Sequence, residues 1–89
     1  MFFDPWSVDR LSARPRYARM DIRAVLGRNV RKYRDRKGLS QETFAFDAEL
    51  HRTYGSGVER GVWNPTVLIV AKLATALGVE PHKLFENLD

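Results

Sequence analysis

Apolar residues recur at helical spacing along most of the chain after residue 20, and polar residues fill the positions between them. In the first such stretch, five apolar residues share one face of a helix: Ile22, Val25, Leu26, Val30 and Tyr33. Asp21 is suited to cap the start of this helix, and Gly38 is suited to end it in the left-handed conformation. The pattern predicts an amphipathic first helix that carries arginine and lysine on its other faces.

Two shorter helices follow in the prediction. Ser40 is suited to cap a second helix that runs to Ala48. Three of its side chains turn inward: Phe44, Ala45 and Ala48. Residues 49–50 make a tight turn, and a third helix extends over about residues 51–60 and ends at Gly61. Two short helices joined in this way, directly after a basic helix, have the shape that fits a DNA major groove.

A proline-containing loop separates these helices from the rest of the chain. Pro65 disfavours the helical conformation at the residue before it, and Thr66 caps a fourth helix that ends at Gly78. Apolar residues nearly surround this predicted core helix: Val67, Leu68, Val70, Ala71, Leu73, Ala74 and Leu77. Pro81 is well placed to begin a fifth helix. The apolar residues of that helix are Leu84, Phe85 and Leu88.

These elements combine into one predicted architecture of the all-α class. A chain of 89 residues has room for one small hydrophobic core. We predict a compact five-helix domain over residues 21–89, preceded by a less regular N-terminal extension over residues 1–20.

Several functions are disfavoured by residue types that the sequence lacks. The chain contains no cysteine, which removes disulfides, thiolate metal ligands and thiol catalysis together. His51 and His82 have no partners at metal-ligand spacing, and no nucleophile–base pair or phosphate-binding loop is recognisable. We therefore predict that the protein is not an enzyme and uses no metal and no cofactor.

The apolar runs are also too short for a membrane protein. The longest, residues 67–71, is interrupted by Lys72 and cannot span a bilayer. The first three residues meet Asp4 and Pro5 at once, so no signal-peptide core is recognisable. We expect a soluble protein of the bacterial cytoplasm.

The net charge of +4 is concentrated in the first half of the chain. Residues 21–39 carry seven basic and two acidic side chains, whereas residues 40–61 carry two basic and four acidic ones. Such a basic cluster suits a polyanion, because each phosphate that is neutralised releases condensed counterions. A solvated helix face is the alternative explanation, and charge alone does not decide between the two.

Five short elements occur in a defined order: GLSQ at residues 38–41, Ala45, ERG at 59–61, NPT at 64–66 and ALGV at 76–79. In this order, over about residues 22–88, the sequence resembles the Cro/C1 (XRE-type) helix-turn-helix family. The resemblance implies a lambda-repressor-like fold. It also implies a sequence-specific transcription regulator, of repressor or controller type, that binds palindromic operator DNA as a dimer.

The resemblance assigns roles to individual residues. In family members the first residues of the third helix meet base edges, and here these residues are Arg52 and Thr53. Arg52 can place its guanidinium on O6 and N7 of a guanine, and the methyl group of Thr53 can touch a thymine methyl. Ser56 and Gly57 are expected next on the same exposed face. Gln41 matches a residue that typically holds a phosphate.

Further roles concern the support of the third helix, the DNA backbone and self-association. Arg34 matches a family arginine that pairs with the glutamate matching Glu59, and this ion pair would lock the third helix onto the first. We add Tyr54, Arg31 and Lys37 as candidates for phosphate contact. Candidates for dimerisation lie on the fifth helix: Leu84, Phe85 and Leu88. Core packing is the alternative role of these three residues.

Gly55 and Gly57 depart from the family pattern, which usually has a bulky aliphatic residue at the first of these positions. Two glycines cost about 2 kcal/mol of helix propensity relative to alanine. Three explanations are open. A bulky side chain from elsewhere fills the gap that the missing side chain leaves, or the third helix is irregular and Gly57 lets the backbone approach DNA closely. In the third explanation, DNA binding is weakened or lost. The candidates for filling the space are Phe2, Phe3, Trp6 and Trp63.

The N-terminal extension lies outside the family pattern and has three open interpretations. It is a basic arm that enters the minor groove through Arg14, Arg16 or Arg19, a hydrophobic flap used in self-association, or an addition before a natural start at Met20. The alternative function for the whole chain is an antitoxin-like protein-interaction module with secondary or lost DNA binding. Its partner would be a protein such as a toxin or polymerase.

Overall fold

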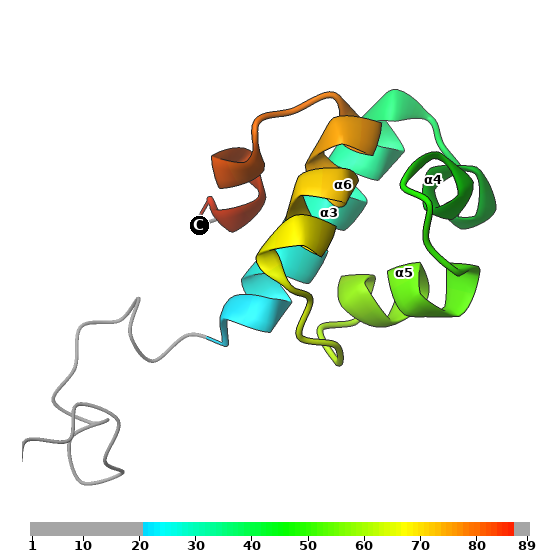
Figure 1. Ribbon diagram of the computed structural model, residues 1–89. Coiled ribbons are helices and arrows are strands. Elements are labelled where there is room, and N and C mark those ends of the chain that lie inside the picture. Colours follow the sequence, from blue (N-terminus) through cyan, green and yellow to red (C-terminus); the bar gives the residue numbers. More distant parts are fainter. Residues whose placement is uncertain (1–20, 87–89) are drawn as a thin grey trace, which may run out of the picture.

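Four α-helices and one 3-10 helix follow one another along residues 21–86, the part of the chain that the computed structural model describes (Figure 1). The elements are α3 (Ile22–Lys37), α4 (Gln41–Asp47), α5 (Arg52–Glu59), α6 (Val67–Leu77) and the 3-10 helix η1 (Pro81–Phe85). The predicted all-α class is confirmed. The predicted N-terminal extension and Leu88 lie outside the described residues.

The helices begin and end at the residues that the local sequence predicts. The side chains of Asp21, Ser40 and Thr66 each accept a hydrogen bond from a backbone N–H in the first turn of α3, α4 and α6. Gly38 and Gly78 end α3 and α6 with positive φ values of 72° and 71°. Because these signals involve neighbouring residues only, they are visible in the sequence without the fold.

The core lies where α3 and α6 pack against the other elements. Figure 1 shows α6 in front of α3, with α4 and α5 on one side and η1 on the other. The buried core draws on each of these elements: Leu26, Val30, Phe44, Val58, Leu73, Leu77 and Leu84. Gly27 allows α5 to approach α3 closely, because a Cβ at this position would lie 2.6 Å from the carbonyl oxygen of Glu59.

Two details of the predicted helices are wrong. The fifth helix is a five-residue 3-10 helix, Pro81–Phe85, and Glu86 directly after it has an extended conformation. The fourth helix is buried along one side only, since Val67 and Leu68 in its first turn are largely exposed. Apolar composition predicted a surrounded helix, but the small core covers only the face formed by residues such as Leu73 and Leu77.

A buried asparagine attaches η1 to α3. Asn29 is fully buried, and its Nδ2 donates to the carbonyl oxygens of Leu84 at 3.0 Å and Glu86 at 2.7 Å. The same nitrogen lies 3.1 Å from the carbonyl oxygen of Val25 within α3. A buried hydrogen-bonded amide of this kind fixes the place of a short element that has little apolar surface of its own.

Candidate nucleic-acid interface

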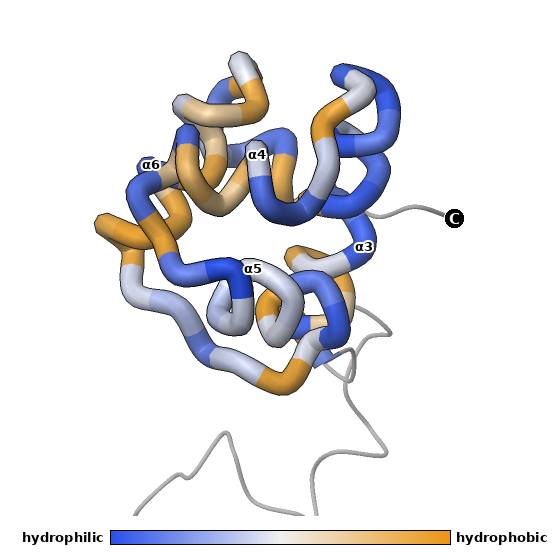
Figure 2. Tube along the Cα trace, turned by 90° about the vertical axis from the view of Figure 1, so that its right-hand side faces the viewer, coloured by the Kyte–Doolittle hydropathy of each residue, from blue (hydrophilic) through white to orange (hydrophobic). Residues whose placement is uncertain are grey.

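The start of α5 is presented on the surface by a tight turn after α4. Glu49 has a positive φ of 59°, and the N–H of Leu50 donates to the carbonyl oxygen of Ala45 at 2.8 Å, which turns the chain sharply. Figure 2 faces α4 and α5, and most of α5 has hydrophilic or intermediate hydropathy there. The sequence of α5, RTYGSGVE, contains a single aliphatic residue, Val58, and that residue is buried.

Polar side chains of α4 and α5 surround a shallow hollow of about 200 Å³. Its lining consists of Gln41, Arg52, Thr53, Ser56 and Arg60. We call this surface the polar hollow. It brings together four residues that the sequence assigned to DNA contact, and it adds Arg60, which follows α5 and was not predicted. Arg60 belongs to the ERG element, but nothing in that element indicated that it would line a surface together with Gln41.

A nearly buried ion pair supports the polar hollow from beneath. Nε of Arg34 lies 2.6 Å from Oε2 of Glu59, and Nη2 of Arg34 lies 3.0 Å from Oε1. The two side chains are 12% and 4% exposed. The hydrogen bonds from Arg34 to Glu59 raise the pKa of the arginine above its ordinary value. The structure thus contains the ion pair that the sequence led us to expect, and the pair ties α5 to α3.

Two further hydrogen bonds extend this support to α4. Nη1 of Arg34 donates to the carbonyl oxygen of Leu39 at 2.8 Å, just before α4 begins. Nε2 of Gln41 donates to Oε1 of Glu59 at 3.3 Å. Gln41 is therefore oriented by the same carboxylate that holds α5, and it stands at the rim of the polar hollow.

An acidic side chain shares the exposed face with Arg52. Nη1 of Arg52 lies 3.4 Å from Oε1 of Glu42, and both side chains are largely exposed. Sequence reasoning did not single out Glu42, because the two residues are ten positions apart and meet only when the turn brings α4 beside α5. The carboxylate holds Arg52 against α4 and lowers the positive charge of the surface.

Gly57 does not lie on the exposed face that was predicted for it. A Cβ at this position would overlap Cδ1 and Nε1 of Trp63, which covers Gly57 from the loop after α5. The indole also stacks on Tyr54, with ring centroids 5.8 Å apart and an angle of 12° between the ring planes. The assignment of Gly57 to base contact is therefore wrong, because the indole separates it from solvent.

No bulky side chain from elsewhere in the described part of the chain packs against Gly55, where the sequence predicted a gap. A Cβ at Gly55 would meet only the Cβ of Ala45, at an ordinary contact distance of 3.9 Å. Trp63 is the candidate that fills space on α5, but it does so at Gly57. The other candidates, Phe2, Phe3 and Trp6, lie outside the described residues.

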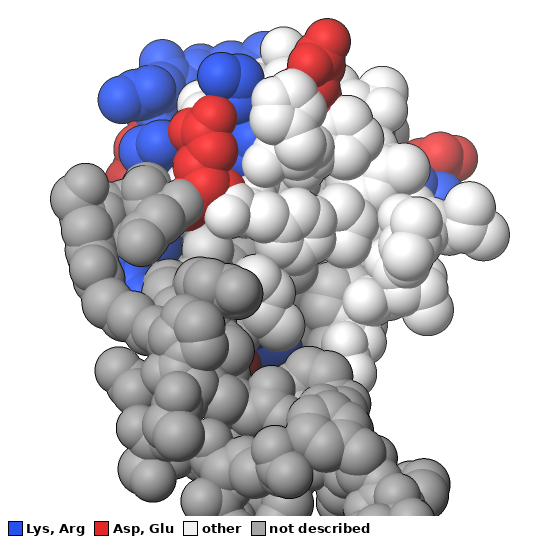
Figure 3. Space-filling model, turned by 90° about the vertical axis from the view of Figure 1, so that its left-hand side faces the viewer, with Lys and Arg blue, Asp and Glu red and all other residues white. Residues whose placement is uncertain are grey.

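The basic side chains of α3 are engaged in different ways. Nζ of Lys37 donates to the carbonyl oxygen of Ala76 at 2.9 Å and so satisfies the end of α6. Lys32 and Arg36 lie over the ring of Tyr33, at 4.7 and 5.6 Å from its centre. Arg31 is exposed, with its Nε 3.9 Å from Asp35. Figure 3 shows Lys and Arg gathered on part of one face, with acidic side chains among them.

The candidates for dimerisation separate into different environments. Leu84 is fully buried in the core, so its assignment to an exposed dimer surface is wrong. Phe85 is 41% exposed on η1. Core packing, the alternative role, therefore applies to Leu84.

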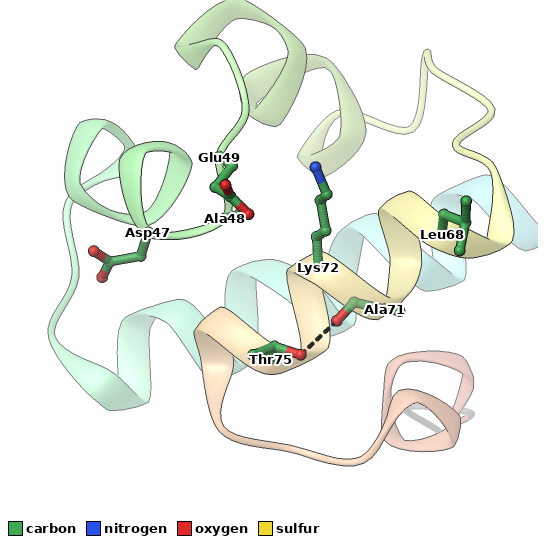
Figure 4. A pocket seen from close by; sticks show the side chains of 7 residues that line it. All are labelled: Asp47, Ala48, Glu49, Leu68, Ala71, Lys72 and Thr75. Atoms are coloured by element: carbon green, nitrogen blue, oxygen red, sulfur yellow. Dashed lines mark hydrogen bonds between the residues drawn. The ribbon is translucent and has the colours of Figure 1, made fainter.

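A second hollow, of about 380 Å³, lies between the end of α4 and α6. Figure 4 shows its lining: Asp47, Ala48, Glu49, Leu68, Ala71, Lys72 and Thr75. It is open and combines apolar groups with two carboxylates and one ammonium group. Sequence reasoning did not predict it.

Two other kinds of site find no support between residues 21 and 86. No helix in this part of the chain combines the length and the apolar character needed to cross a lipid bilayer. Nor does the same part contain a group of three or more His, Cys, Asp and Glu side chains arranged to hold a metal ion.

Comparison with known proteins places this geometry in context. A family model described as helix-turn-helix matches residues 30–84. The Neisseria hypothetical transcription factor of Neisseria meningitidis is 48% identical over 64 residues, which span 72% of this chain and 60% of that protein. Control protein C.BamHI of Bacillus amyloliquefaciens is 42% identical over 67 residues, which span 74% of this chain and 83% of that protein.

A solved structure has a similar fold. The restriction-modification controller protein C.AhdI from Aeromonas hydrophila matches with a TM-score of 0.69 and 49% sequence identity. The match covers 71% of this chain and 96% of that one.

Proposed function

The chain belongs to the XRE-type helix-turn-helix family of DNA-binding transcriptional regulators, and from this premise we propose that it binds a palindromic operator as a dimer. The family is one of DNA-binding regulators rather than of enzymes. The observation that carries the proposal is the polar hollow, where the start of α5 and Gln41 of α4 present hydrogen-bonding groups beside the Arg34–Glu59 ion pair.

Each group in the polar hollow has a proposed role. Arg52 donates to O6 and N7 of a guanine, Thr53 contacts a thymine methyl, and Ser56 contacts a neighbouring base. Gln41 contacts a phosphate and so fixes the register of the helix on the duplex. Arg31 and Tyr54 remain proposed phosphate contacts. Lys37 is a weaker candidate, because its ammonium is bonded to the carbonyl oxygen of Ala76.

The relatives suggest which genes the protein serves. Two of the similar proteins are called control proteins or restriction-modification controllers. We propose that this chain is likewise a controller of restriction–modification genes, acting by occupying operator DNA. In a dimer bound to one face of the duplex, half-site centres lie about 34–36 Å apart.

Selection of the purified protein against a random duplex pool tests the proposal. The expected result is an enriched inverted repeat whose affinity falls steeply with salt concentration. Arg52→Ala should then lose about 1–3 kcal/mol on the selected duplex and relax the preference at one base pair in each half-site. Arg28→Ala is the matched control, because Arg28 is exposed on α3 outside the polar hollow and its loss should leave the base preference unchanged, whatever it does to the affinity for all duplexes. Equal binding by wild type and Arg52→Ala would contradict the assigned orientation of α5.

A second candidate function rests on the hollow between α4 and α6. Exposed apolar residues lie on its margin or on the same elements: Phe46, Val67 and Leu68. Such a surface suits a protein partner, as in the antitoxin-like module with a toxin or polymerase as partner. Failure to enrich any duplex, together with weak binding to all of them, would favour this second function.

A further inference from the structure

The contact between Trp63 and α5 replaces a side chain that α5 lacks. Gly57 has no Cβ, and the five-membered ring of the Trp63 indole occupies the space where one would stand. The indole atom Cε2 would lie 3.0 Å from that Cβ. Any other residue at position 57 must therefore displace the indole. At Gly55, in the same helix, only Ala45 lies within reach of an added Cβ, at 3.9 Å.

The indole spans one turn of α5. Residues 54 and 57 are three positions apart and share a face of the helix, and Trp63 stacks on the ring of Tyr54 while its edge lies on Gly57. The loop is joined to α5 beside this contact, since the N–H of Val62 donates to the carbonyl oxygen of Gly57 at 3.0 Å. We call the set of Tyr54, Gly57 and Trp63 the aromatic clasp.

Trp63 is the exposed member of the aromatic clasp, whereas Tyr54 packs against the core and Gly57 is buried. Trp63 is 45% exposed, and it lies outside the cluster of buried residues and the residues packed on it. Two residues of α5, Tyr54 and Gly57, lie against the indole. A helix of eight residues that contains two glycines has little stability of its own, so a contact that bridges one of its turns acts on its order directly.

We propose that Trp63 is a positioning residue for DNA recognition: by clasping Gly57 and Tyr54 it holds α5 so that Arg52 and Ser56 face the bases together. The proposal rests on the function proposed above, because it concerns the same reading surface. A reading helix that is ordered before binding loses less conformational freedom on the duplex. The gain falls on the selected site, where the geometry of base contact matters, more than on unrelated DNA, where phosphate contacts dominate.

Truncation of the side chain at position 63 and enlargement of the residue at position 57 test the aromatic clasp. The variants are Trp63→Ala, Gly57→Ala and the combination of both, with Gly55→Ala as matched control and Trp63→Phe as conservative replacement. For each, the measured quantity is the ratio of affinities for the selected duplex and a scrambled duplex. The measurement is made at a temperature where circular dichroism shows every variant folded.

The expected results follow from the overlap. Trp63→Ala should lower the affinity ratio by about two- to tenfold, the range expected for loss of one aromatic stacking pair. Gly57→Ala should lower it similarly in the wild-type background and should cause no further loss when Trp63 is already alanine. Trp63→Phe should restore part of the ratio. Gly55→Ala should leave it unchanged, because its methyl group meets an ordinary contact.

A spectroscopic measurement follows the indole itself. The chain has two tryptophans, so the replacement Trp6→Phe leaves Trp63 as the sole indole. In that background Gly57→Ala should shift the emission of the free protein to longer wavelength, because the displaced indole becomes more exposed to water. Gly55→Ala should not shift it.

The outcomes separate this proposal from the proposed function. A wild type that selects no duplex would overturn both. A wild type that selects its duplex while Trp63→Ala keeps the full affinity ratio would overturn only the role of Trp63. The role of Trp63 would also be overturned if Gly57→Ala lowered the affinity ratio equally with and without the indole. The same holds if Trp63→Ala lowered the melting temperature but not the affinity ratio.

Discussion

Glu59 is the residue on which the geometry of the polar hollow depends most. Its carboxylate receives Nε and Nη2 of Arg34 and Nε2 of Gln41, and it is only 4% exposed. Removing one partner of a buried ion pair leaves the other charge without compensation. Glu59 therefore links α5 to both α3 and α4, in addition to the core packing of Val58.

Replacement of Glu59 by glutamine tests this dependence. Glu59→Gln keeps the shape but removes the charge, and it should lower the free energy of unfolding by at most about 3–5 kcal/mol, because Asp35 remains 3.7 Å from Nη1 of Arg34. Urea denaturation followed by circular dichroism measures the change. Glu42→Gln is the control, because Glu42 belongs to an exposed ion pair whose loss changes stability by at most ~1 kcal/mol. Equal stability of the two variants would show that the buried pair does not hold the fold.

Glu42 should matter for DNA binding even though it matters little for stability. Its carboxylate lies 3.4 Å from Arg52, on the face that meets the polyanion in the proposed function. Glu42→Gln should raise the affinity for unrelated duplexes and lower the ratio between selected and unrelated DNA. The physical reason is that the released Arg52 can contact any phosphate. A salt titration on both duplexes measures this, and a higher ratio in the variant would contradict the assigned role.

At the residue scale, the sequence predicted pairings only where a family resemblance supplied them. Arg34 and Glu59 were paired on that ground. The contact of Arg52 with Glu42 was not foreseen, since it needs the path of the chain through a turn. Trp63 was a candidate for filling space on α5, but its contact is with Gly57 rather than at Gly55. Leu84 was offered to a dimer surface because an apolar pattern shows which residues avoid water but not what covers them.

At the scale of elements, the turn between α4 and α5 contains a strained position. Glu49 has a φ of 59°, in the left-handed region that residues other than glycine rarely adopt. That conformation costs a residue with a side chain ~1–2 kcal/mol, and glycine avoids the cost. Glycine also has greater conformational freedom in the unfolded chain, and this offsets ~0.4–1 kcal/mol of the stabilisation.

We therefore expect Glu49→Gly to stabilise the protein by up to about 1.6 kcal/mol. Thermal and urea denaturation measure the change. Glu80→Gly is the matched control, because Glu80 is an exposed glutamate with an ordinary φ of −71° and should gain nothing from glycine. A loss of stability in Glu49→Gly would mean that the Glu49 side chain contributes more than the strain removes.

The 3-10 helix η1 depends on Asn29 more than on its own sequence. Asn29→Leu would leave the carbonyl oxygens of Leu84 and Glu86 without their buried donor, which should cost about 1–3 kcal/mol. In this variant, amide hydrogen exchange should be faster than in the wild type in η1, with a smaller change in α6. Unchanged exchange in η1 would show that the burial of Leu84 alone fixes this element.

The ends of elements were predictable where their causes are local. Asp21, Ser40, Thr66, Gly38 and Gly78 act on their immediate neighbours, and the structure has helix ends at these residues. The form of η1 was not predictable, because it depends on a hydrogen bond to Leu84 from the buried amide of Asn29, which lies more than fifty residues earlier in the chain. Pro81 correctly marked the start of the element but said nothing of its length.

At the scale of the whole molecule, one core of modest size supports two exposed surfaces. The polar hollow gathers the groups of α4 and α5 that suit DNA. Phe85 stands on η1, a different element, and is the described dimerisation candidate that remains accessible. The predicted all-α class followed from helical periodicity and local capping residues, whereas the division of the surface depends on which sides of the helices the core covers.

Substitution of an exposed phenylalanine on each surface tests whether the dimer forms through η1 or through the hollow between α4 and α6. Phe85→Ser removes an exposed ring whose neighbour Leu84 fills the core, so the fold should remain while self-association weakens. Affinity for a full inverted repeat should then fall toward that for a single half-site, a loss within the roughly 10²–10⁴-fold that bivalent attachment contributes. Sedimentation and titration of both duplexes measure the two effects.

Phe46→Ser is the matched control for this experiment, because Phe46 is an exposed phenylalanine on α4 rather than on η1. It should leave both self-association and the preference for the full repeat intact. If Phe46→Ser dissociates the dimer and Phe85→Ser does not, the copies meet through the α4 side. Self-association would then compete with DNA for α4, because the polar hollow includes Gln41 at the start of that helix. A regulator that uses both surfaces at once therefore requires the η1 arrangement.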